Sequence, residues 1–139
     1  TNQAIDRIIN FFPEERRQQL LMDLSLNLRA TISQRLMPKK DGKGRVPAIE
    51  IMINSPLISD HIFKGQVHEI KDAMKGSREL GMQTFDQSLF DLYEAGQISY
   101  TDALRNADSL NDLRLQIKLH GKEAKDRDLT AGIGHLDIV

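Results

Sequence analysis

Two Gly-Lys pairs are the residues in this chain whose types could hold a phosphate. A phosphate-binding loop of the form Gly-x-x-x-x-Gly-Lys-Ser/Thr surrounds phosphate oxygens with backbone amides, and its lysine completes the site. The pairs here are Gly42-Lys43 and Gly121-Lys122, and neither is followed by Ser or Thr. We therefore interpret Gly42-Lys43 as part of a turn, and we expect no cofactor to be bound by this chain.

Histidines and carboxylates could bind a metal ion or act as acid–base groups. His68 and Asp72 stand at i, i+4 spacing, but zinc needs three or four ligands, so a local hydrogen bond is the expectation. His61 falls on an apolar helix face and is expected at the core boundary with one hydrogen bond. The spacing of the carboxylates indicates capping or solvated helix faces, and we predict no catalytic and no metal-binding residue. The carboxylates concerned are Asp86, Asp91, Glu94 and Asp102.

A cluster of four cations is the remaining candidate site. Lys39, Lys40, Lys43 and Arg45 surround Asp41 in a chain with 19 basic and 20 acidic residues. The cluster is either a solvated turn or a contact with an acidic surface or phosphate of a neighbouring subunit. Nucleic-acid binding is disfavoured, because no aromatic residue is interleaved and the overall charge is balanced.

The spacing of apolar residues along the chain predicts the helices and strands that position these candidate residues. Residues 3–28 show helical spacing with a break near Phe12, and 31–53 alternate around Asp41-Gly42, which is the signal of one β-hairpin. Residues 54–119 again read as helices, and the polar stretch 120–139 is expected to be a mobile tail. The predicted fold is therefore mainly α with one hairpin.

The stretch "GMQT", Gly81 to Thr84, stands out between two of these helices. Thr84 and Gln87 have the spacing of a capping box, in which the two side chains satisfy each other's backbone amides at a helix start. We predict that Thr84 is a structural cap, and that "GMQT" marks a helix start and carries no chemistry.

Composition limits the class of protein further. A length of 139 residues suits one domain, and the absence of cysteine excludes disulfides. Nothing approaches the roughly 18 apolar residues that a membrane-spanning helix needs. The chain begins with Thr1 instead of Met, and we interpret it as a fragment of a longer protein.

Several motifs in order carry a family resemblance over Thr1 to about Asp108. They are "AIDRIINFFPEE", the basic "DGKGRV" hairpin, the "NSP" helix start and "GMQTFDQSLFDLYEAGQIS". In this order and spacing the chain resembles the C-terminal part of the RecA-like ATPase domain of type IV pilus retraction ATPases, the PilT/PilU group. It is most similar to the PilU branch, because "LISDHIFKGQ" stands where the PilT pattern has "AIRNLIREGK", with Ser59 and Phe63 in place of two arginines.

The resemblance implies an α/β RecA-like parent domain in a cytoplasmic hexamer, peripheral at the inner membrane, that uses ATP and Mg²⁺ to power pilus retraction in twitching motility. A PilT-like ATPase and the inner-membrane pilus base protein would be its partners. The family's phosphate loop and catalytic residues precede this region, so the isolated chain is expected to be a structural and subunit-interaction module, not an enzyme. The alternatives are a free-standing helical adaptor or regulatory domain and, less favoured, a helix-turn-helix module around "GQISYTDALRNA".

Overall fold

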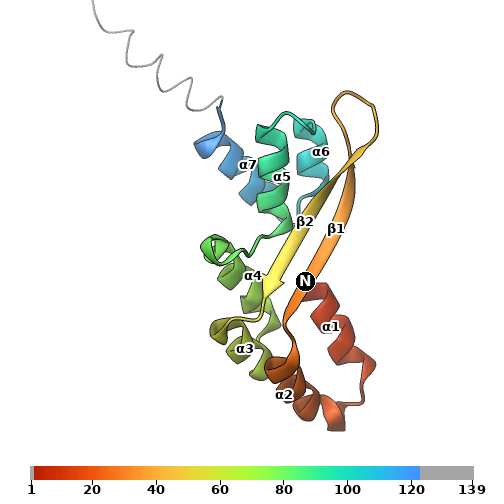
Figure 1. Ribbon diagram of the computed structural model, residues 1–139, viewed down its shortest axis with the longest axis vertical. Helices are drawn as coiled ribbons and strands as arrows, with labels where there is room; N and C mark the ends of the chain where they lie inside the picture. The colour runs from red at the N-terminus through yellow and green to blue at the C-terminus, as the bar shows by residue number, and fades with distance from the viewer. Residues whose placement is uncertain (1, 123–139) are drawn as a thin grey trace, which may run out of the picture.

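The computed structural model describes residues 2–122 (Figure 1). Helices stand on both sides of a single hairpin in the chain order, which confirms the predicted class, mainly α with one β-hairpin. The α-helices are α1 (Asn2–Phe11), α2 (Arg17–Asn27), α3 (Pro56–Phe63), α4 (Val67–Lys75), α5 (Phe85–Glu94), α6 (Tyr100–Asn106) and α7 (Leu110–His120). The strands are β1 (Ala30–Pro38) and β2 (Arg45–Ile53), and the 3₁₀ helices are η1 (Glu14–Arg16) and η2 (Arg78–Leu80).

The break predicted near Phe12 lies between α1 and α2, but its detail differs from the expectation. Proline suits the first position of a helix, and Pro13 could therefore start a long one, but it immediately precedes η1, with a ψ of 150°. The helix proper starts only at Arg17. Glu14 and Glu15 therefore occupy the first turn of a short 3₁₀ helix.

The hairpin pairs β1 and β2 antiparallel, from Ala30 opposite Ile53 to Pro38 opposite Arg45. The backbone N–H groups of Ile49 and Ile51 point away from β1, toward Ser88 Oγ and the Gln83 carbonyl. Pro47 has the same parity along β2, so its missing N–H costs no bond between the two strands.

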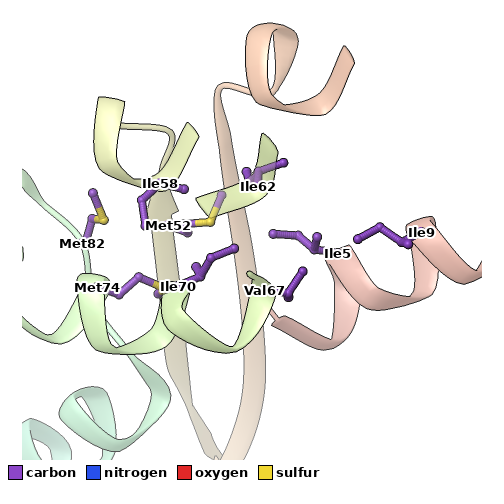
Figure 2. Packing of buried hydrophobic residues seen from close by; sticks show 9 residues of the cluster. All are labelled: Ile5, Ile9, Met52, Ile58, Ile62, Val67, Ile70, Met74 and Met82. Atoms are coloured by element: carbon purple, nitrogen blue, oxygen red, sulfur yellow. The ribbon is translucent and has the colours of Figure 1, made fainter. Parts of the chain in front are cut away.

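A first core closes around one end of the hairpin and joins α1, α3 and α4 (Figure 2). In each helix the buried positions recur at i, i+3, i+4 or i+7, which is the spacing of one helix face. Met52 of β2 and Met82 of the GMQT segment complete the core. Its buried members are Ile5, Ile9, Met52, Ile58, Ile62, Val67, Ile70, Met74 and Met82.

A second core lies toward the other end of the hairpin, where α5, α6 and α7 gather in Figure 1. Helix α5 packs along β2, and Met37 and Ala48 contribute the strand side. The hairpin is therefore the common support of two helical groups, α1–α4 and α5–α7. The buried members of the second core are Met37, Ala48, Phe85, Leu89, Ile98, Ala103, Leu104 and Leu113.

No helix among the described residues is long and apolar enough to cross a membrane.

Candidate functional site

The basic cluster forms the exposed tip of the hairpin. Lys39, Lys40, Lys43 and Arg45 are all exposed, and no ion pair joins them to another residue of the described range 2–122. The single acid of the tip, Asp41, uses its carboxylate to accept the Lys43 backbone N–H at 2.8 Å. The tip therefore presents four cations against one carboxylate.

The backbone of this tip is held in place. The Lys39 N–H donates to the Gly44 carbonyl at 3.1 Å, and Gly42 and Gly44 take the positive φ values of 72° and 86° that their turn requires. The Lys40 N–H donates to the Gln97 carbonyl at 2.8 Å, in the loop between α5 and α6. The cations are thus displayed on a fixed loop anchored to the second helical group.

Every residue of the GMQT segment has a structural task. Gly81 turns the chain with a φ of 87°, and Met82 is 1% exposed in the first core. Gln83 exchanges both backbone hydrogen bonds with Ile51, at 2.8 and 2.9 Å, and its Nε2 donates to the Ile49 carbonyl. The segment therefore closes the outer edge of β2, a contact that the sequence did not reveal.

Thr84 ends the segment as the N-cap of α5. Its Oγ1 accepts the Gln87 N–H at 3.3 Å, and Gln87 Oε1 accepts the Thr84 N–H at 3.1 Å. The Gln87 Nε2 also donates to the Lys75 carbonyl at the end of α4. The capping box thereby ties α5 to α4 as well as starting the helix.

Thr84→Ala is expected to lower the free energy of unfolding by about 1 kcal/mol, because it leaves a helix-start amide without its acceptor. Urea unfolding of the 139-residue chain measures this change. Thr84→Ser keeps the hydroxyl and should recover most of the loss. An equal loss in the two variants would assign the effect to the methyl group and not to the cap.

Asp86 has a capping role, which is one of the two roles expected for these carboxylates, but the helix that it caps is α7 and not its own helix α5. It is only 8% exposed, and its two oxygens accept the backbone N–H groups of Asp108 and Ser109 at 2.7 and 3.0 Å. A carboxylate on α5 thus caps the entry to α7, 22 residues later. Of the other carboxylates, Asp91 pairs with the half-exposed Arg78 and Asp102 accepts from Ser99 Oγ at 2.7 Å.

A second polar junction joins the two helical groups. Asp108 pairs with Lys71 of α4 and, at 3.2 Å, with Arg35 of β1. Arg35 also donates to the Asn106 carbonyl at 2.9 Å and lies 4.3 Å from the centroid of the Phe85 ring. Burial alone would raise the pKa of Asp108, but its hydrogen bond to Lys71 and the charges of Lys71 and Arg35 outweigh burial and lower it.

Asp108 should therefore stabilise the fold in a pH-dependent way. Its pKa in the folded chain lies below the ordinary 3.8, so its contribution is complete above about pH 4 and disappears as pH falls through the lower, folded value. Asp108→Asn should unfold with a weaker dependence on pH below 4 than the unchanged chain. Circular dichroism at pH 2 to 5 checks this, and identical acid transitions in the two proteins would contradict it.

The histidines of α3 and α4 make short-range contacts. His68 Nε2 lies 3.2 Å from Glu69 Oε1, and Asp72 pairs with Lys75. His68 therefore makes the local contact that was expected, but its partner is Glu69 and not Asp72. His61 has the single hydrogen bond that was expected, with Nδ1 at 3.2 Å from Gln66 Oε1. No group of three potential metal ligands occurs within residues 2–122.

No family model matches the chain, but its structure is similar to solved structures of known proteins. The fold is similar to the crystal structure of the pilus retraction motor PilT with bound ADP, with a TM-score of 0.73 and 32% identity over 83% of this chain and 32% of that one. The hairpin and its helices are therefore part of an ATPase-domain fold of the pilus-motor type.

Sequence similarity gives the family. The chain is 56% identical to the type IV pilus ATPase PilU of Pseudomonas aeruginosa over 134 residues, 95% of this chain and 35% of PilU. It is 40% identical to the retraction ATPase PilT of the same organism over 104 residues. The chain belongs to the PilT/PilU family of type IV pilus ATPases, and it spans about a third of the length of these relatives.

Sequence reasoning found the hairpin cations and the cap at Thr84, and it missed Arg35, Lys71 and the roles of Asp86 and Asp108. These four residues come from four separate stretches of the chain: β1, α4, α5 and the link between α6 and α7. No local spacing signal could have joined them.

Proposed function

We propose that this chain is the structural and subunit-interaction portion of a PilU-like hexameric ATPase that powers type IV pilus retraction. The observation that carries the proposal is the 56% identity to PilU over 95% of the chain. In the parent protein, ATP and Mg²⁺ would be held by residues outside this chain, in a ring at the cytoplasmic face of the inner membrane. The pilus base protein and a PilT-like ATPase would be its partners.

The outer side of the hairpin supports a place within a larger domain. Strand β1 pairs only with β2 among the described residues, so the N–H and C=O groups of its other edge have no strand partner there. Ile32 and Leu36 on that strand are 72% and 54% exposed, and the residue between them on the same face of the strand, Gln34, is uncharged. An exposed, apolar strand edge is a liability in water, and further secondary structure of the ATPase domain would cover it.

We assign to the hairpin tip a contact with a neighbouring subunit of the ring. Its four cations are exposed, fixed by the Lys40–Gln97 hydrogen bond, and offset by one carboxylate that is engaged with the backbone. Head-to-tail packing in a ring places a loop of one subunit on a different surface of the next. A tip of this charge suits an acidic surface there.

Reversing three of these charges should weaken the ring. In the full-length protein, Lys39→Glu, Lys40→Glu and Lys43→Glu together are expected to lower the fraction of hexamer in sedimentation velocity at low salt. Each exposed ion pair contributes only about 0–1 kcal/mol, so the three are changed at once. The difference from the unchanged protein should shrink at high salt, because screening acts within about 8 Å at physiological ionic strength.

A matched control separates this contact from total charge. Lys64→Glu, Arg114→Glu and Lys118→Glu make the same change of charge at exposed positions directly after α3 and on α7. This control should leave the hexamer fraction close to that of the unchanged protein. If the tip variant also leaves the hexamer and its salt dependence unchanged, the tip is only a solvated turn.

A further inference from the structure

A pocket lies between α1, α2 and the start of α4, at the opposite end of the hairpin from the basic tip. Its volume is about 450 Å³. Three apolar side chains, Ile9, Leu21 and Val67, belong to the lining. Figure 2 shows Val67 of α4 near Ile5 and Ile9 of α1 in the first core. Four polar side chains share the lining with apolar groups and one glycine. The lining residues are Asp6, Ile9, Asn10, Arg17, Leu21, Gly65, Val67 and His68.

Arg17 is the unusual member of this lining. Its Nε is buried and has no hydrogen-bond partner, and the side chain makes no ion pair within the part of the chain that the structure describes. A buried donor that finds no acceptor destabilises a fold. A guanidinium presents its N–H groups as a planar fork that matches the two oxygens of a carboxylate. An occupant carrying such a group would pair with this guanidinium, whose charge has no ion-pair partner among the described residues.

The other polar groups of the lining favour a carboxylate on a peptide side chain over a free diacid. Asp6 lines the same pocket, yet no ion pair joins it to Arg17. Its negative charge opposes a free diacid, whereas it can accept an N–H group from a peptide. Asn10 and His68 offer further hydrogen-bonding groups in the same lining, and its apolar side chains suit methylene groups. A carboxylate on a peptide side chain meets all of these conditions.

We propose that this pocket binds an Asp or Glu side chain of a partner protein, with the carboxylate on Arg17 and a neighbouring peptide N–H on Asp6. Next to Asn10 along the chain, Phe11 is 86% and Phe12 39% exposed, and the two rings meet edge to face at 6.0 Å. Arginine and aromatic side chains are enriched among the residues that dominate binding energy at protein interfaces. The proposal does not depend on the proposed role of the hairpin tip.

The test uses N-acetyl-glutamate N-methylamide as the probe and the Arg17 Nε–H resonance of the 139-residue chain as the readout. Titration at constant ionic strength should move this resonance saturably, while sodium chloride should not. Arg17→Gln and Arg17→Lys should each weaken the binding of the probe at least tenfold, monitored on the Val67 amide. Arg16→Gln, at the exposed neighbouring arginine, is the matched control and should leave the affinity unchanged.

Binding of two further small molecules could overturn the proposal. N-acetyl-glutamine N-methylamide has nearly the same shape without the charge, and it should bind at least tenfold more weakly than the glutamate probe. Succinate should also bind more weakly, because Asp6 opposes a dianion. Equal affinity for the glutamine probe, tighter binding of succinate, or an unmoved Arg17 resonance would each show that the pocket is no site for a protein carboxylate.

Discussion

Asp86→Ala is expected to lower the free energy of unfolding of this chain by about 2–3 kcal/mol. The carboxylate is buried and accepts two backbone N–H groups, from Asp108 and Ser109, which would lose their acceptor in the variant. Hydrogen bonds to a charged group contribute about 1.5–3 kcal/mol, and donors left unsatisfied in a buried site add to the loss. Urea denaturation followed by circular dichroism measures the difference.

Two controls show whether the effect comes from this cap. Asp91→Ala removes a carboxylate from the same helix, but Asp91 is 46% exposed in a surface pair with Arg78, so its loss should cost below about 1 kcal/mol. Asp86→Asn keeps one acceptor oxygen, so its loss of unfolding free energy should lie between those of Asp86→Ala and Asp91→Ala. Equal destabilisation by Asp86→Ala and Asp91→Ala would mean that the α7 entry does not depend on Asp86.

Ile62→Ala is expected to be the most destabilising single change considered, at about 3 kcal/mol. Ile62 is fully buried in the first core, where α1, α3 and α4 meet (Figure 2). Truncating a buried isoleucine removes apolar contact and leaves a cavity, and such changes cost about 2–5 kcal/mol. The unfolding midpoint in urea, with the slope compared between variants, measures the loss.

The neighbouring residue gives the matched control for this prediction. Phe63 follows Ile62 in the same helix but is 54% exposed, so Phe63→Ala removes a larger side chain with less buried area. Its effect should stay within about 1 kcal/mol. If Phe63→Ala were as costly as Ile62→Ala, the assignment of the inward face of α3 would be wrong.

The local features of this protein were determined by its sequence. Asp41-Gly42 and Gly44 between two alternating stretches predicted the hairpin, because few other residues adopt the positive φ of such a turn. The Thr84–Gln87 spacing predicted a helix start. The ordered motifs indicated the PilT/PilU family, which the 56% identity to PilU then confirmed. All of these signals act between residues that are close in the chain.

The long-range contacts were decided only by the tertiary structure. Asp86 has the sequence position of a helix-start acid, yet its oxygens cap the entry to α7, because α5 and α7 pack against each other. Arg35 and Lys71 reach Asp108 from β1 and α4, and Gln83 reaches the edge of β2. A hydrogen bond between residues far apart in sequence depends on how the helices pack on the hairpin, and no periodicity or cap signal encodes that packing.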